Sequence, residues 1–372
     1  MLFRSHPVPR TAAERRSARG YPAAVATPVG ADPGVVGPYL ASALGDDKWR
    51  SVTVELIAAG MSNLTYVVTP EGGPADDAVI LRRPPTGAVL ATAHDMAREH
   101  RVISALAGTP VPVPRTLHLA TDTSVLGAPF YVMERVVGVH VVTDLPPGYA
   151  DEPAQRRAIA DGLMDTLADL HAVDPAGVGL ADFGRPEGFL ERQVRRWTKQ
   201  WDATRDSERP ALDALAARLA ETVPASARSG ITHGDYRLDN CLLDPEAPGR
   251  IRAVLDWEMS TLGDPLTDIG MLFVYWPQAG EDRGVSVSSV STLPGFPTRR
   301  ELAERYAQRS GADLADLNWY VGFAYFKFAA IVAGIVARSA AGAMAGKDTT
   351  GYADKIDPCV ELGRAALEDG AL

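Results

Sequence analysis

Residues 230–258 carry the sequence GITHGDYRLDNCLLDPEAPGRIRAVLDWE. Within it, the apolar triplets Cys241–Leu243 and Ala253–Leu255 flank a turn rich in Pro and Gly, a pattern that predicts a β-hairpin. If the triplets pair antiparallel, with the first residue of one facing the last residue of the other, Asn240 faces Asp256 at the open end of the hairpin. Facing residues have Cα atoms about 5 Å apart. The sequence therefore predicts that an amide oxygen and a carboxylate meet there.

The polar residues around this open end suit phosphoryl transfer. Mg²⁺ takes few protein oxygens and completes its shell with water and phosphate, so Asn240 and Asp256 are candidate metal ligands. Asp235 lies on the loop that enters the hairpin and is a candidate to accept a proton from a substrate hydroxyl. Arg237 is placed to offset charge on a phosphoryl group in transit. We expect His233 to support the loop by hydrogen bonding, because a lone histidine is more often structural than catalytic.

Three polar elements occur in a fixed order along this part of the chain. The first is His233-Gly234-Asp235 followed by Asn240, the second is Leu255-Asp256-Trp257-Glu258, and the third is Gly263-Asp264-Pro265-Leu266-Thr267-Asp268-Ile269-Gly270. Together they resemble the aminoglycoside phosphotransferase/choline-kinase family. The resemblance is closest to the branch that also occurs as a kinase-like domain attached to some acyl-CoA dehydrogenases.

The resemblance implies a fold similar to that of protein kinases, with a β-rich N-lobe, a hinge and a helical C-lobe. It implies ATP as the phosphoryl donor, Asp235 as the catalytic base and Asn240 with Asp256 as the Mg²⁺ ligands. It also implies that Asp268 braces the catalytic loop from the start of the next helix. A Ser/Thr protein kinase is disfavoured, because DWE replaces DFG and Asp264 follows Asp256 by only eight positions, which leaves no room for an activation segment.

The first lobe offers an independent check. The stretch AHDMAREHRVISAL (93–106) predicts a helix from about His94, and Glu99 falls on its apolar stripe. A buried carboxylate needs a partner. The preceding strand AVILRR offers Arg82 or Arg83, of which only one can point inward. We favour Arg82, which aligns with the strand cation of the family; a surface Arg–Glu pair of little energetic value is the alternative.

Two further segments are candidates for nucleotide binding. The turn that contains Ser62 and Asn63 lies between two predicted strands, and in the family this turn covers the nucleotide phosphates. The stretch FYVMERV fits the family's hinge strand, where backbone groups of Glu134 and Val136 would hold the adenine. An ordinary core strand also fits its apolar residues, and the two interpretations are compatible.

The chain as a whole predicts an α+β protein of two lobes. We expect a partly disordered leader and a short helix in 1–45, an N-lobe of antiparallel sheet plus one helix in 46–134, and a helical C-lobe with the catalytic loop in 135–372. The apolar stretch Trp319–Ala337 is long enough to span a membrane, but Lys327 lies in its middle, so we predict a buried core helix and no membrane span. Lys327 itself lies either near the acceptor site or in a buried ion pair.

Composition limits the partners and the compartment. The formal net charge of −10 argues against a broad nucleic-acid-binding surface. The chain has only two cysteines and no CxxC pair, which favours a reducing, cytoplasmic setting.

We therefore predict an ATP- and Mg²⁺-dependent phosphotransferase that acts on a hydroxyl of a small molecule. The closer branch of the family favours a hydroxyacyl-CoA-like metabolite over an aminoglycoside as the acceptor. The alternative is a catalytically silent kinase-like module that binds a nucleotide or an acyl ligand.

Overall fold

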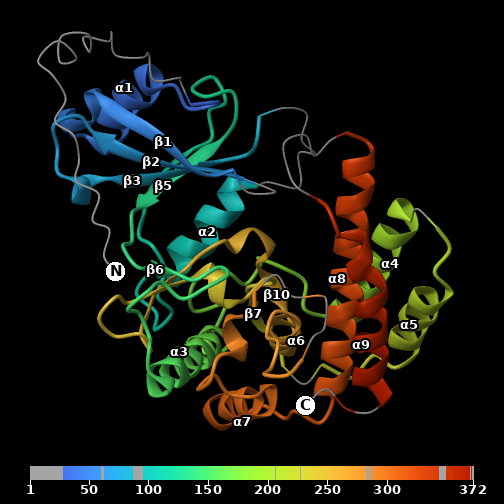
Figure 1. Ribbon diagram of the computed structural model, residues 1–372. Coiled ribbons are helices and arrows are strands. Elements are labelled where there is room, and N and C mark those ends of the chain that lie inside the picture. Colours follow the sequence, from blue (N-terminus) through green and yellow to red (C-terminus); the bar gives the residue numbers. More distant parts are fainter. Residues whose placement is uncertain are drawn as a thin grey trace, which may run out of the picture.

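A computed structural model of the chain describes residues 28–59, 63–86, 95–205, 207–226, 228–281, 285, 288–342, 349–368 and 370. Most of the predicted leader, residues 1–27, and Ser62 of the predicted phosphate turn lie outside these ranges. Figure 1 shows a lobe built around a sheet, with a larger, mainly helical lobe beside it. This is the α+β, two-lobed arrangement that the sequence predicts.

The sheet of the N-lobe has five antiparallel strands in the order β1-β2-β3-β5-β4. The bounds are Val52–Ala59 for β1, Leu64–Pro70 for β2, Val79–Arg83 for β3, Thr116–Ala120 for β4 and Phe130–Glu134 for β5, with helices α1 (Pro33–Leu44) and α2 (Met96–Leu106). Strand β4 is missing from the sequence prediction, because it lies at the edge of the sheet and four of its five residues are only half-buried.

Side-chain alternation along β3 separates the two faces of this sheet. Leu81 packs in the same apolar cluster as the buried residues of α1, whereas Ile80 packs with those of α2. Since residues two apart share a face, Arg82 points with Ile80 toward α2, and Arg83 points with Leu81 toward α1. The central position of β3, buried along its whole length, thus decides which arginine meets the helix that carries Glu99.

Helix α2 begins two residues later than the sequence predicts. Asp95 is its N-cap and accepts a hydrogen bond from the amide of Arg98 at 2.9 Å. Capping of this kind satisfies amides that the first helical turn leaves without partners. Glu99 therefore lies in the first turn of α2, on its buried face.

The predicted hairpin in the helical lobe is present, but its register differs from the prediction. Cys241 pairs with Val254, and the amide of Leu255 donates to the carbonyl of Asn240 at 2.8 Å. The predicted facing of Asn240 and Asp256 is therefore wrong by one residue: Asn240 faces Leu255, and Asp256 follows next in the chain. The second strand is Ile251–Val254 rather than the apolar triplet that ends at Leu255, and a bulge between Leu242 and Leu243 places an extra residue on this strand; neither can be read from the apolar alternation.

Short strands and seven helices of the described residues make up the rest of the C-lobe. The strands are β6 (Val139–His140), β7 (Gly230–Thr232), β8 (Cys241–Leu243), β9 (Ile251–Val254) and β10 (Thr261–Gly263). The helices are α3 (Pro153–Ala172), α4 (Phe189–Thr204), α5 (Pro210–Glu221), α6 (Leu266–Val274), α7 (Arg299–Ser310), α8 (Leu317–Ala340) and α9 (Ile356–Glu368).

Helix α8 is the central helix of this lobe and packs against α4, α5, α6 and α9 (Figure 1). Its length and hydropathy would suit a membrane span, but 83% of its most apolar window is buried inside the protein, as expected for a core helix. Gly270 of α6 allows the two helices to approach closely, since a Cβ there would lie 2.5 Å from the carbonyl oxygen of Tyr320 on α8. This close packing places Lys327 of α8 beneath the loop that follows β7.

Candidate active site

The loop between β7 and β8 is held from below by a buried carboxylate. Asp268, in the first turn of α6, accepts the amide of His233 through Oδ2 and the amide of Gly234 through Oδ1, each at 2.7 Å. His171 Nε2 also contacts Asp268 Oδ2 at 3.1 Å, and its Nδ1 lies 2.7 Å from the hydroxyl of Tyr306. Burial alone would raise the pKa of Asp268, but the hydrogen bond and charge of His171 hold it below its usual range.

Two residues of the loop itself fix its shape. Gly234 has φ +85°, and a Cβ at this position would lie 2.7 Å from the carbonyl oxygen of Met259, so the turn requires glycine. The side chain of His233 contacts the carbonyl of Leu255 through Nε2 at 2.9 Å, and its ring packs on that of Trp257. The structure thus places His233 and Asp268 where they support the loop.

Asp235, the candidate base, is only partly buried and is contacted from two sides. The Asn240 amide donates to the Asp235 carbonyl at 2.8 Å and to its Oδ2 at 3.1 Å. Arg237 Nε donates to the same Oδ2 at 3.2 Å, and Arg237 Nη1 lies 2.7 Å from Asp239 Oδ2. The guanidinium of Arg237 also stacks on the ring of Tyr275. These contacts orient the carboxylate while about a quarter of its surface stays open to solvent.

A second polar cluster joins the two lobes around Arg82. Its Nε lies 3.1 Å from Glu99 Oε2, and its Nη2 is bonded to Asp256. Burial alone would lower the pKa of Arg82, but the charges of Glu99 and Asp256 raise it, so the guanidinium stays charged. Tyr131 donates its hydroxyl proton to Glu99 Oε2 at 2.9 Å. Arg82, from β3, therefore connects helix α2 to the end of β9, whereas Arg83 donates to backbone carbonyls on the other face of the sheet.

The carboxylates of this cluster could contribute to a cation site. Ligand oxygens of Glu99, Asp256 and Glu258 lie within 4.8 Å of one another, and carboxylate oxygens are the donors that Mg²⁺ prefers. Asp256, two residues beyond the end of β9, adopts the left-handed conformation, with φ 64°. This conformation is rare for residues other than Gly and most accessible to Asp and Asn. Asn240 lies beside the end of β9, because its carbonyl accepts the amide of Leu255.

Two residues of this cluster received no role from sequence reasoning. Glu258 ends the LDWE motif. Its position two residues after Asp256 is the feature of the sequence that could have indicated a second carboxylate at this site. Tyr131 lies opposite Arg82 in the sheet and so shares its face, a relation that appears only once the strands are paired. Both residues bind partners of the predicted site, Glu258 through Asn63 and Tyr131 through Glu99.

Asn63 is a buried residue that lies between two carboxylates. Its side chain is 3% exposed, and its amide donates to Glu99 at 2.7 Å and to Glu258 at 3.0 Å. A neutral amide donor between two carboxylates reduces their repulsion. Its predicted contact with nucleotide phosphates therefore stays a prediction, as does that of Ser62, which lies outside the described residues.

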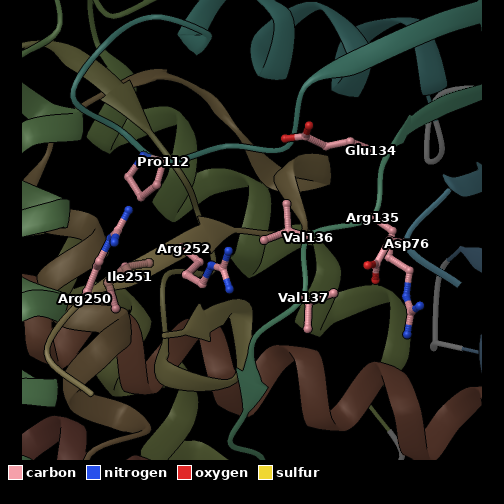
Figure 2. Close-up of a pocket in the computed structure, with 9 residues that line it drawn as sticks. All are labelled: Asp76, Pro112, Glu134, Arg135, Val136, Val137, Arg250, Ile251 and Arg252. Atoms are coloured by element: carbon pink, nitrogen blue, oxygen red, sulfur yellow. The ribbon is translucent and has the colours of Figure 1, made fainter. Parts of the chain in front are cut away.

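The hinge borders a surface hollow of about 450 Å³, in which residues 134–137 form one side and residues 250–252, at the start of β9, the other (Figure 2). Its lining residues are Asp76, Pro112, Glu134, Arg135, Val136, Val137, Arg250, Ile251 and Arg252. None of Arg82, Asp235 or Asp256 belongs to this hollow. The amide of Glu134 donates to the carbonyl of Arg115 at 2.9 Å, and the predicted adenine contacts of Glu134 and Val136 stay predictions.

The sequence profile described as Phosphotransferase enzyme family matches residues 53–320. The chain belongs to this family. The match begins in β1 and ends in α8, so it includes the strand of Arg82, the loop of Asp235 and the hairpin that precedes Asp256.

Two relatives of this chain are much longer than the chain itself. Acyl-CoA dehydrogenase family member 10 of Mus musculus is 37% identical over 308 residues, which cover 82% of this chain and 28% of the relative. Acyl-CoA dehydrogenase family member 11 of Rattus norvegicus is 36% identical over 327 residues, which cover 86% of this chain and 41% of the relative. The chain thus spans less than half the length of either relative.

Solved structures show the same fold. A Ralstonia eutropha protein, provisionally assigned as an aminoglycoside phosphotransferase, matches with a TM-score of 0.77 and 32% identity over 91% of this chain and 98% of its own. Choline kinase of Cryptosporidium parvum matches with a TM-score of 0.61 at 12% identity, over 91% and 96% of the two chains. A mutant aminoglycoside phosphotransferase in a ternary complex with ADP and hygromycin B matches with a TM-score of 0.58 at 15% identity, over 91% and 99%. The last two are similar in fold alone.

Proposed function

We propose that this family member is an ATP- and Mg²⁺-dependent phosphotransferase that moves the γ-phosphate to a hydroxyl group of a small molecule. The observation that carries the proposal is the placement of Asp235. Its carboxylate is oriented by Asn240 and Arg237, remains partly open to solvent, and lies on a loop braced by the buried Asp268. A base held in this way can orient an acceptor hydroxyl and take its proton.

The roles of the other residues follow from their chemistry. Asn240 and Asp256 are the proposed Mg²⁺ ligands, and Glu258 lies close enough to Asp256 to supply a further oxygen. When bound, Mg²⁺ and ATP supply a transferable phosphoryl group whose charge is partly neutralised. Arg237 is proposed to stabilise charge on that group, although in this structure its donors are engaged by Asp235 and Asp239.

Nucleotide binding is assigned to the N-lobe side of the site. Arg82, oriented by Glu99, is the proposed phosphate-binding cation. The turn of Ser62 and Asn63 is proposed to cover the phosphates, and backbone groups of Glu134 and Val136 to contact the adenine. These assignments divide the site between the proposed N-lobe, 46–134, and the proposed C-lobe, 135–372.

A hydroxyacyl-CoA-like metabolite is the acceptor that we favour over an aminoglycoside. The curated relatives carry the name of acyl-CoA dehydrogenases, and a phosphotransferase attached to such an enzyme would sensibly act on an acyl thioester. CoA phosphates require cations, and exposed basic side chains occur on the adjacent helices α4 and α8, namely Arg195, Arg196, Lys199 and Arg338. A cytoplasmic location fits the two cysteines, which are both buried and unpaired.

Mass spectrometry of acceptor candidates tests the proposed function. The protein is incubated with ATP and Mg²⁺ and a panel of hydroxyacyl-CoA esters that differ in the position of the hydroxyl, with the free hydroxy acids, choline and an aminoglycoside in parallel. We expect a phosphorylated product from at least one hydroxyacyl-CoA. Calorimetric binding of Mg²⁺–ATP without any phosphorylated product would instead favour the silent nucleotide-binding module.

The two neighbouring arginines of β3 give a matched pair of variants. Arg82→Ala should weaken Mg²⁺–ATP binding by about tenfold or more, because a charge-assisted contact to phosphate is lost. Arg83→Ala should leave ATP affinity within about threefold but lower the free energy of unfolding by about 1 kcal/mol, because the partly buried backbone carbonyls of Gly30 and Leu126 lose their donor. Calorimetry with Mg²⁺–ATP and urea denaturation measure the two effects. Equal losses of ATP affinity in both variants would contradict the assignment of Arg82.

A further inference from the structure

Lys327 is a buried cation that the proposed mechanism does not yet use. It lies in the middle of the apolar helix α8, with 7% of its surface exposed. Burial lowers the pKa of Lys327, and the charges of Asp235 and Asp268 oppose that shift. An ammonium group in such surroundings is costly unless it has a polar partner, so its contacts indicate what it does.

The partner of Lys327 is a backbone carbonyl of the catalytic loop. Its Nζ donates to the carbonyl oxygen of Gly234 at 2.9 Å, and the ammonium lies 5.6 Å from the ring centroid of Trp197 on α4. Among the described residues, no carboxylate forms a salt bridge with Lys327 at contact distance. Of the two places expected for it from the sequence, the buried ion pair is therefore wrong for the described residues, and a position near the acceptor site stays a prediction.

Gly234 is consequently held at both of its backbone polar groups. Its amide donates to Asp268 of α6, and its carbonyl accepts from Lys327 of α8. The peptide group that contains this carbonyl also contains the amide nitrogen of Asp235, and a peptide group is planar. Holding the Gly234 carbonyl in place thus also holds the plane of the peptide group between Gly234 and Asp235, and with it the position of the Asp235 backbone nitrogen. Without Lys327, the glycine at φ +85° would allow this plane to rotate more freely.

We propose that Lys327 is a positioning residue for phosphoryl transfer: by holding the Gly234 carbonyl from helix α8, it sets the direction of the Asp235 carboxylate toward the acceptor. The proposal rests on the proposed function of Asp235 as the base. Lys327 contacts the loop of Asp235 and Trp197 of α4 rather than the Arg82 cluster, so its loss should affect turnover and leave nucleotide binding unchanged.

The test compares Lys327→Met with Lys355→Met. Lys355 makes the same kind of contact elsewhere, donating to the Val285 carbonyl at 3.1 Å with its ammonium over the Tyr352 ring. We expect Lys327→Met to lower kcat by about 10- to 100-fold, as a misplaced catalytic group does, with KM and Kd for Mg²⁺–ATP within about twofold. Lys355→Met should keep kcat within about twofold.

Hydrogen exchange of the nucleotide-free protein supplies a measurement independent of activity. Amides of residues 230–243 should exchange faster in Lys327→Met than in the unchanged protein or in Lys355→Met, while peptides of the N-lobe keep their rates. If Lys327→Met does not fold, Lys327→Gln, which keeps a donor on a shorter chain, should change kcat and exchange in the same directions.

An unchanged kcat in Lys327→Met would overturn the inference, and so would unchanged hydrogen exchange of residues 230–243. Losses of kcat, ATP affinity and folded fraction in equal proportion would also overturn it, because they would show a structural role only. If the protein without any substitution transfers no phosphate to any acceptor of the panel, the proposed function is refuted. In that case faster loop exchange in Lys327→Met would still support Lys327 as the residue that holds Gly234, so the two failures are distinguishable.

Discussion

Asp235→Asn should lower the rate of phosphoryl transfer by about 10³-fold while the protein stays folded and still binds Mg²⁺–ATP. General-base groups contribute about 10²- to 10⁴-fold to enzymatic rates, and an amide cannot take the hydroxyl proton. Asparagine has the same shape as aspartate and retains an oxygen that can accept the hydrogen bond from Arg237 or Asn240. Formation of the phosphorylated acceptor measures the loss, and calorimetry should give a Kd for Mg²⁺–ATP within about threefold of that of the unchanged protein.

Asp239→Asn is the matched control for this variant. Asp239 is also a carboxylate of the loop and also pairs with Arg237, at 2.7 Å, but it has no proposed contact with the reacting groups. Its substitution should reduce turnover less than tenfold. If Asp235→Asn keeps more than a tenth of the original kcat, or if the two variants lose activity equally, Asp235 is not the base.

Asp256→Asn should lower Mg²⁺-dependent turnover by about 10²-fold or more, because the metal loses an anionic oxygen that helps to neutralise the transferred group. Asn is preferable to Ala here, since residue 256 has φ 64° and asparagine tolerates this conformation while alanine does not. Glu99 remains as a partner of Arg82, so the fold should persist. Raising the Mg²⁺ concentration should recover part of the activity, which a purely structural defect would not show.

Asp244→Asn provides the control at the other end of the same hairpin. Asp244 accepts the amides of Glu246 and Ala247 in the turn, and the asparagine oxygen can accept them as well. This variant should retain activity within about twofold and an unchanged Mg²⁺ requirement. Turnover in Asp256→Asn that equals the unchanged protein at low Mg²⁺ would remove Asp256 from the metal site.

Periodicity and motif order were sufficient for much of this molecule. The 3.6-residue pattern placed Glu99 on the buried face of α2, and the apolar run with a single lysine indicated a core helix. The order of the three polar elements indicated the family, which the match over 53–320 confirms. Helix α9 was missed because residues 356–368 contain Pro358 and Gly363, which disfavour a helix in isolation; Gly363 is accepted because α8 packs against it.

The pattern of the sequence does not predict which side chains of distant segments contact one another. Alternation showed that one of Arg82 and Arg83 must point inward and the family resemblance favoured Arg82, but it is the packing of β3 between α1 and α2 that turns Arg82 to Glu99. The amide of Asn63 meets Glu258, 195 positions away, a contact that no local pattern contains. The roles of the site residues remain predictions that the variants above can test.

The sequence by itself determined the order of the chemical groups, the family and the faces of the long helices, because these depend on spacing along the chain. The tertiary structure decided the register of the hairpin that precedes Asp256, the arginine that meets Glu99, and the carbonyl that receives Lys327. Each of these depends on contacts between segments far apart in the chain. The physical reasons are that strand register depends on the turn and on bulges, which the apolar pattern does not contain, and that a buried charge takes the polar partner that packing brings within reach.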